Sequence, residues 1–180
     1  ADSIATYQTI NEEPELSAEV ESMRKDLNGL FTSFEAPAVP EDCLPKEEAQ
    51  LTELIGQGKL LREGKPKGKR PQDAAAVKSL SAFTEKYADA STAYALLAQA
   101  KLYNAEAPRT VKTAAKVAGK LCPEWAFPAN LVGTAHFIEK DWDEAEVSYR
   151  EALGKSANYA GPRFNLAMIS MQRKEPAKAI

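Results

Sequence analysis

The stretch DWDEAEVSYREAL, residues 141–153, has the residue spacing of an amphipathic helix. Trp142, Ala145, Tyr149 and Ala152 recur at steps of three and four residues, so they share one face of an α-helix. Charged side chains occupy most of the positions between them. The spacing therefore predicts a helix that buries one face against the rest of the chain.

The preceding segment NLVGTAHFIEK, residues 130–140, predicts a second helix. Its apolar residues also fall at helical spacing: Leu131, Val132, Ala135 and Ile138. Asp141 separates the two segments and is a suitable N-cap, because its carboxylate can accept a hydrogen bond from a backbone N–H of the first turn. Two short amphipathic helices with so short a connection predict an antiparallel helical hairpin.

The same pattern returns 34 residues later. Val132-Gly133 becomes Leu166-Ala167, and Glu144-Ala145 becomes Lys178-Ala179. Pro176 stands at the start of the second helix expected there, where a missing N–H costs nothing. A fixed period of this length is typical of stacked helical repeats.

The pattern resembles the tetratricopeptide repeat, a unit that reads roughly W-x2-L-G-x2-Y, then A-x3-F, then P. Val132-Gly133 with His136 matches the L-G-x2-Y part, Ala145 with Tyr149 matches A-x3-F, and Ala152-Leu153 matches the closing A-L pair. The match departs from the family at three positions: Ala129 replaces Trp, His136 replaces an aromatic residue, and Ala157 replaces the terminal Pro.

The resemblance implies an all-α protein, a right-handed α–α superhelix (a solenoid) of helical hairpins. It implies packing roles for a set of small and apolar residues: Gly133, Ala145, Tyr149, Ala152, Leu166 and Ala167. Small residues at 133 and 145 allow the two helices of a hairpin to approach closely, and Tyr149 fills the gap between neighbouring hairpins.

The domain organisation follows from the repeats. We expect an N-terminal helical arm and Pro-rich connector over 1–45 and a repeat domain over 46–180. Within the repeat domain the expected units are 46–90 (degenerate), 91–124, 126–158 and 159–180 (truncated). A unit that stops inside its second helix suggests a fragment or an end capped by something else.

The segment LSAEVESMRKDLNGLFTSF, residues 16–34, carries a heptad stripe of apolar residues. The stripe consists of Leu16, Val20, Met23, Leu27, Leu30 and Phe34. It is compatible with a coiled-coil dimerisation arm, but fewer than three heptads are present, which favours a single helix packed on the repeats.

Composition sets the remaining limits. The chain has 180 residues and a net charge of −3, and its first 50 residues carry 12 acidic and 3 basic side chains. Neither an apolar run of membrane-spanning length nor a dense basic stripe is present, so we expect no membrane span and no nucleic-acid partner. The basic segment REGKPKGKRPQ, residues 62–72, is interpreted as a solvated loop, with an acidic partner as the alternative. The start at Ala1 favours, weakly, a processed bacterial extracytoplasmic protein, with a cytoplasmic one also possible.

The sequence contains no recognisable catalytic or metal-binding motif. His136, the sole histidine, falls at a packing position, and Cys43 and Cys122 are far apart in the sequence. The cysteines can pair if the fold brings them together, but we expect them to be free and structural. GQGK, residues 56–59, lies in an amphipathic segment and lacks P-loop spacing. We therefore expect no enzyme, no cofactor and no metal site.

The family implies a function in protein–protein interaction. The first helices of its hairpins line a concave groove that holds a peptide or a partner's helix. The corresponding positions here are Gln99, Tyr103, Asn130, Thr134, Phe137, Phe164 and Met168, although Phe137 and Met168 can equally belong to the hairpin core. A carboxylate clamp is disfavoured, because Asn165 lacks the accompanying Lys and Arg. The alternative function is a structural domain that self-associates through 16–34 and the open C-terminal repeat face.

Overall fold

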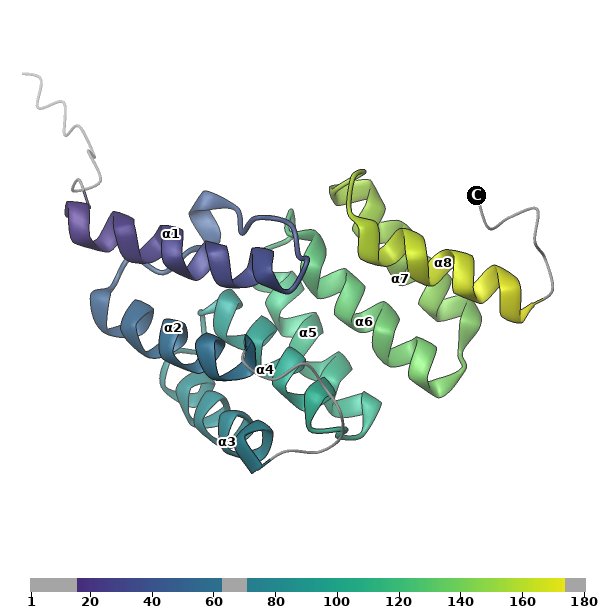
Figure 1. Ribbon diagram of the computed structural model, residues 1–180, viewed down its shortest axis with the longest axis horizontal. Helices are drawn as coiled ribbons and strands as arrows, with labels where there is room; N and C mark the ends of the chain where they lie inside the picture. Colours follow the sequence, from purple (N-terminus) through teal and green to yellow (C-terminus); the bar gives the residue numbers. More distant parts are fainter. Residues whose placement is uncertain (1–15, 63–70, 174–180) are drawn as a thin grey trace, which may run out of the picture.

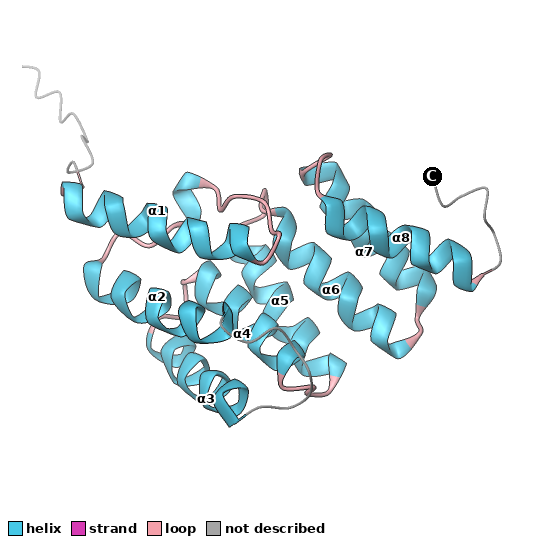
Figure 2. Ribbon diagram, viewed as in Figure 1, coloured by secondary structure: helices cyan, strands magenta, loops and turns pink. Residues whose placement is uncertain are grey.

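The computed structural model describes residues 16–62 and 71–173, and over these ranges the chain is all helical, with no strand (Figures 1 and 2). The helices are α1 (Ala18–Ser33), η1 (Glu41–Cys43), α2 (Glu48–Arg62), α3 (Pro71–Lys86), α4 (Ser91–Tyr103), α5 (Pro108–Leu121), α6 (Ala126–Glu139), α7 (Trp142–Lys155) and α8 (Ala160–Gln172). The all-α prediction is confirmed for this part of the chain. The expected helices over 130–140 and 141–153 correspond to α6 and α7.

The helices from α2 onward pack mainly against their neighbours in the sequence. Contacts between α2 and α4, α4 and α6, and α6 and α8 place these four helices in one row. Each of α3, α5 and α7 packs against the two members of the row that flank it in the sequence (Figure 1). The row matters for function because every predicted groove residue lies on α4, α6 or α8.

The turn between α6 and α7 differs in detail from the prediction. Asp141 occupies the N-cap position of α7, but its side chain makes no capping hydrogen bond. One of its carboxylate oxygens lies instead 3.1 Å from Nδ1 of His136. Lys140 closes α6 with a φ of 62°, in the left-handed region, and this reversal directs the chain into α7.

Gly133 and Tyr149 bring α6 and α7 into close contact. Tyr149 is fully buried, and a Cβ placed on Gly133 would lie 2.7 Å from two carbons of its ring. Ala145, Tyr149 and Ala152, for which packing roles are predicted, are all 0% exposed. Leu166 is half-buried and packs on the cluster that contains Ala145, Tyr149 and Ile169. Ala167 is half-buried.

Replacing Gly133 with alanine is expected to destabilise the fold. Alanine in a helix interior gains about 1 kcal/mol over glycine, but forcing an extra methyl into a packed core costs about 1–3 kcal/mol. We expect the clash with the Tyr149 ring to outweigh the helix gain, for a net loss of about 1 kcal/mol, measured by urea denaturation. Gly154→Ala is the control, because nothing lies within 4 Å of its added Cβ. Equal stabilisation of both variants would contradict the close contact.

Helix α1 packs on α2 and extends towards α6. The heptad stripe forms its inner face: Val20, Leu27 and Leu30 are buried, and Leu16, Met23 and Phe34 pack against the same core. Leu30 lies over Gly58 of α2, where an added Cβ would be 2.7 Å from Cδ1 of Leu30. The stripe is therefore buried within the chain, as expected for a single packed helix.

Candidate partner-binding surface

Residues 16–45 of the N-terminal arm lie against α2 and against the neighbouring parts of α4 and α6. The ring of Phe31 stacks edge-on against Trp125 and Phe127, at centroid distances of 4.8 and 5.7 Å. The ring of Phe34 meets that of Tyr103 in the same manner, at 6.5 Å. The indole N–H of Trp125 donates to the carbonyl oxygen of Pro37, 3.2 Å away. The arm thus contacts the C-terminal end of α4 and the N-terminal end of α6 through aromatic side chains.

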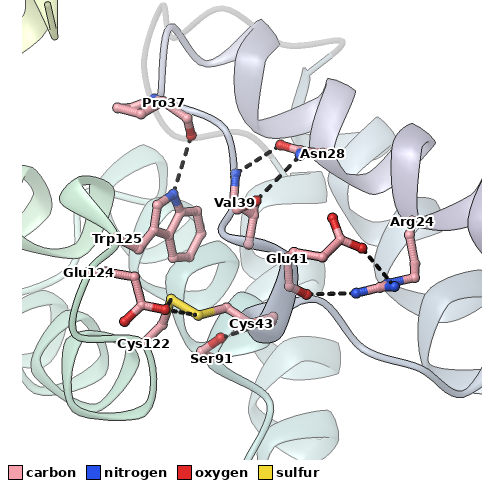
Figure 3. Close-up of a disulfide and its surroundings, with 10 residues drawn as sticks. All are labelled: Arg24, Asn28, Pro37, Val39, Glu41, Cys43, Ser91, Cys122, Glu124 and Trp125. Atoms are coloured by element: carbon pink, nitrogen blue, oxygen red, sulfur yellow. Dashed lines mark hydrogen bonds and ion pairs between the residues drawn. A yellow bond between two sulfur atoms is a disulfide. The ribbon is translucent and has the colours of Figure 1, made fainter. Parts of the chain in front are cut away.

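A disulfide joins Cys43 to Cys122 and fastens the connector after α1 to the turn before α6 (Figure 3). The expectation of free cysteines is therefore wrong. The two Cα atoms lie 5.8 Å apart across a sequence separation of 79, because the connector runs back over the ends of α4 and α6. The Ser91 hydroxyl at the start of α4 donates to the Cys43 carbonyl oxygen, 3.2 Å away, and holds the same path.

Arg24 and Asn28 attach the connector to α1. Arg24 is 4% exposed, and it donates to the carbonyl oxygen of Glu41 at 2.6 Å and pairs with its carboxylate at 2.8 Å. The Asn28 amide group accepts from the backbone N–H of Val39 at 2.9 Å. A buried guanidinium needs such partners, because an unpaired buried charge is strongly destabilising. Arg24 and Asn28 therefore have a structural role, because they hold the connector on α1 (Figure 3).

The predicted groove residues of α4 are less exposed than Phe164, the predicted groove residue on α8. Gln99 is 8% exposed, so it belongs to the buried interior of the row. Tyr103 is half-buried, with its ring against Phe34. The arm therefore already covers the part of the predicted groove to which Tyr103 contributes.

The predicted groove residues of α6 bond to two buried tyrosines. The Asn130 amide donates to the Tyr159 hydroxyl at 3.0 Å, and the Tyr149 hydroxyl donates to Oγ1 of Thr134 at 3.4 Å. Burial raises the pKa of Tyr149 to about 12. It also raises the pKa of Tyr159, to which the nearby Glu35 carboxylate adds. Both phenols therefore stay neutral at physiological pH and fix the side chains of Asn130 and Thr134.

The remaining groove residues divide between core and surface. Phe137 is half-buried, its ring 5.1 Å from that of Trp142, so it belongs to the packing between α6 and α7. Met168 is half-buried on α8. Phe164 is 67% exposed, the highest value among the large hydrophobic residues of the described chain. Of the predicted set, Phe164 is exposed, while Asn130, Thr134 and Met168 are half-buried.

Two features near the surface were not anticipated from the sequence. A cavity of about 400 Å³ lies between α5, α6 and α7 and is lined by apolar residues such as Val132 and Val147 and by Lys116, Lys120 and Glu144. The Tyr159 ring at the start of α8 closes over Gly161, whose added Cβ would lie 3.3 Å from it. In the sequence, the apolar residues of both features have the spacing of ordinary core residues, so the sequence predicts neither feature.

Comparison with protein families and with curated proteins gives no match. No family model matches the chain, and no curated protein resembles it closely enough to count as a match.

In the described part of the chain no helix is both long and apolar enough to cross a bilayer. Most of the basic segment 62–72 falls outside the described residues. The site must therefore be interpreted from its own geometry.

Proposed function

We propose that this protein is an interaction scaffold of the tetratricopeptide type, a superhelix of helical hairpins that binds an apolar segment of a partner protein. Three observations support this proposal: the 34-residue period, the contacts between successive helices, and the close approach of α6 to α7 at the small residue Gly133. The binding surface consists of Asn130 and Thr134 on α6 with Phe164 and Met168 on α8. We refer to these four residues as the α6–α8 surface.

The observation that carries the proposal is the exposure of Phe164. It lies 34 residues after Asn130, and Met168 lies 34 residues after Thr134, so the four residues occupy equivalent positions on two helices of one row. The arm covers the C-terminal end of α4 and the N-terminal end of α6, where it presents aromatic rings to Tyr103 and Phe127. An apolar or aromatic segment of a partner would bind α8 and the adjoining part of α6 in the same manner.

A second candidate is self-association through α8. Phe164 and Met171 are 67% and 63% exposed on this helix, and a second copy could bury both. The arm helix does not contribute to this alternative, because its apolar stripe is buried inside the chain. Sedimentation over a wide concentration range distinguishes the two candidates: a strict monomer removes self-association.

The proposed function is tested with a phage-displayed random peptide library. We expect the protein to select peptides rich in aromatic and aliphatic residues, and Phe164→Ala to weaken the selected peptides by about tenfold or more, as the loss of an aromatic anchor commonly does. Circular dichroism and melting temperature should be unchanged, because the side chain is exposed. Binding is measured by titration calorimetry.

Val147→Ala is the matched control for this test. Val147 is 61% exposed on α7, so the substitution removes a comparable exposed apolar group away from the α6–α8 surface. Its binding should equal that of the unaltered protein. Selection of no peptide, or equal losses in both variants, would contradict the proposal.

A further inference from the structure

Three potential metal-ligand atoms converge where the connector meets the turn before α6. The sulfurs of Cys43 and Cys122 and a carboxylate oxygen of Glu124 all lie within 4.8 Å of one another. The Glu124 oxygen lies 3.1 Å from the Cys43 sulfur and 3.8 Å from that of Cys122. A disulfide sulfur carries no proton, so these distances are contacts of a carboxylate with the sulfurs and give it no hydrogen bond (Figure 3).

The surrounding structure fixes two of the three groups. Cys122 and Glu124 belong to one tight turn, closed by a hydrogen bond from the Trp125 backbone N–H to the Cys122 carbonyl oxygen at 3.2 Å. Trp125 is itself held by the Pro37 carbonyl. Cys122 is buried, Cys43 half-buried and Glu124 exposed, so the group is reachable from solvent on one side. Cys43 lies at the end of the short helix η1, and the Ser91 hydroxyl donates to its carbonyl oxygen at 3.2 Å.

We propose that, when the disulfide is reduced, Cys43, Cys122 and Glu124 form a binding site for a thiophilic divalent cation of the zinc class. Two thiolates and one carboxylate are a donor set that Zn²⁺ accepts, with sulfur at roughly 2.3 Å and oxygen at roughly 2.0–2.2 Å, and a water completes four-fold coordination. The cation would replace the covalent bond as the link between the connector and α6. The connection of the arm would then persist under both oxidising and reducing conditions.

The redox step requires a dithiol reductant. Its first thiolate attacks one sulfur, the Cys43–Cys122 bond breaks, and the mixed disulfide is resolved by the second thiol of the reductant. Two electrons and two protons pass to the cysteines, and the reductant leaves as a cyclic disulfide. Cation binding then displaces the two thiol protons to solvent. The negative charge of Glu124, which opposes two free thiolates beside it, is compensated by the bound cation.

The test uses Cd²⁺ as a spectroscopic probe on the full chain. The protein is reduced with a dithiol, freed of reductant by anaerobic gel filtration and titrated with Cd²⁺ alone. We expect an ultraviolet sulfur-to-cadmium charge-transfer band that saturates at one Cd²⁺ per chain, and a higher melting temperature with either Cd²⁺ or Zn²⁺. The oxidised protein should show neither. A reduced chain that keeps its helical circular dichroism spectrum but gives no band would overturn the proposal, as would one that unfolds and is not refolded by the cation.

Two carboxylate variants test the third ligand. Glu124→Gln should keep the charge-transfer band, because both thiolates remain, but weaken binding by about tenfold or more, since even the loss of a group that only orients a ligand costs about 10–100-fold. Asp42→Asn is the control, since Asp42 adjoins Cys43 and does not belong to the converging group. Its affinity should be unchanged. Equal affinity of Glu124→Gln and the unaltered protein would reduce the site to a bare cysteine pair and refute the assignment.

Discussion

Tyr149→Ala is expected to lower the free energy of unfolding by about 3–5 kcal/mol, the usual cost of removing a large buried aromatic side chain. The ring is 0% exposed, and it fills the space that Gly133 leaves on α6. No neighbour can fill the resulting cavity cheaply, because the opposing residue on α6 has no side chain. Urea denaturation measures the change, provided that both proteins have the same m-value, the slope of the unfolding free energy against urea concentration.

Tyr149→Phe separates the packing of the ring from its hydroxyl. This variant loses only the long hydrogen bond to Thr134, 3.4 Å, and keeps the ring. The expected cost is at most about 1.5 kcal/mol, the net value of a hydrogen bond in a protein. If the alanine variant costs no more than the phenylalanine variant, the proposed contact between α6 and α7 is wrong.

Removal of the disulfide is expected to have a comparable effect. Loop-closure entropy for a separation of 79 residues predicts a loss of about 4–5 kcal/mol. Cys43→Ala with Cys122→Ala tests this, since alanine leaves no buried hydroxyl beside the core. Because typical domains have about 5–15 kcal/mol of stability in total, the variant should fold but melt at a much lower temperature.

The measurement is made with a chelator present, so that no cation substitutes for the bond. Reductant should lower the melting temperature of the unaltered protein and leave that of the double alanine variant unchanged. An unaltered protein whose melting temperature does not respond to full reduction, confirmed by thiol titration, would show that the bond does not stabilise the fold.

Local features of the fold could be predicted from the sequence. The helices over 130–140 and 141–153 follow from apolar residues three and four positions apart, and this spacing also identifies Ala145 and Tyr149 as buried. The apolar stripe over 16–34 predicts the buried face of α1 for the same reason. Each of these features depends on residues within a few turns of one another, which a helix brings together without help from the rest of the chain.

Features that depend on the path of the connector could not be predicted. The pairing of Cys43 with Cys122 and the hydrogen bond from Trp125 to Pro37 join positions 79 and 88 residues apart. No periodicity relates such positions, so the cysteines were wrongly expected to be free. The groove prediction had the same limit. It placed Tyr103 and Phe164 on the same helix row, but it could not show that Phe34 covers the first and leaves the second exposed.

The attachment of the arm to α6 also has a kinetic consequence. Helices that contact only their sequence neighbours can fold and fray independently from either end. Here the hydrogen bond between Pro37 and Trp125 cannot form until Trp125 has been synthesised, 88 residues after Pro37. At synthesis rates of 5–20 residues per second this is a delay of roughly 4–18 s. During that interval the Phe31 ring lacks its contacts with Trp125 and Phe127. Helix α1 therefore reaches these contacts only after α2 to α5 have been synthesised.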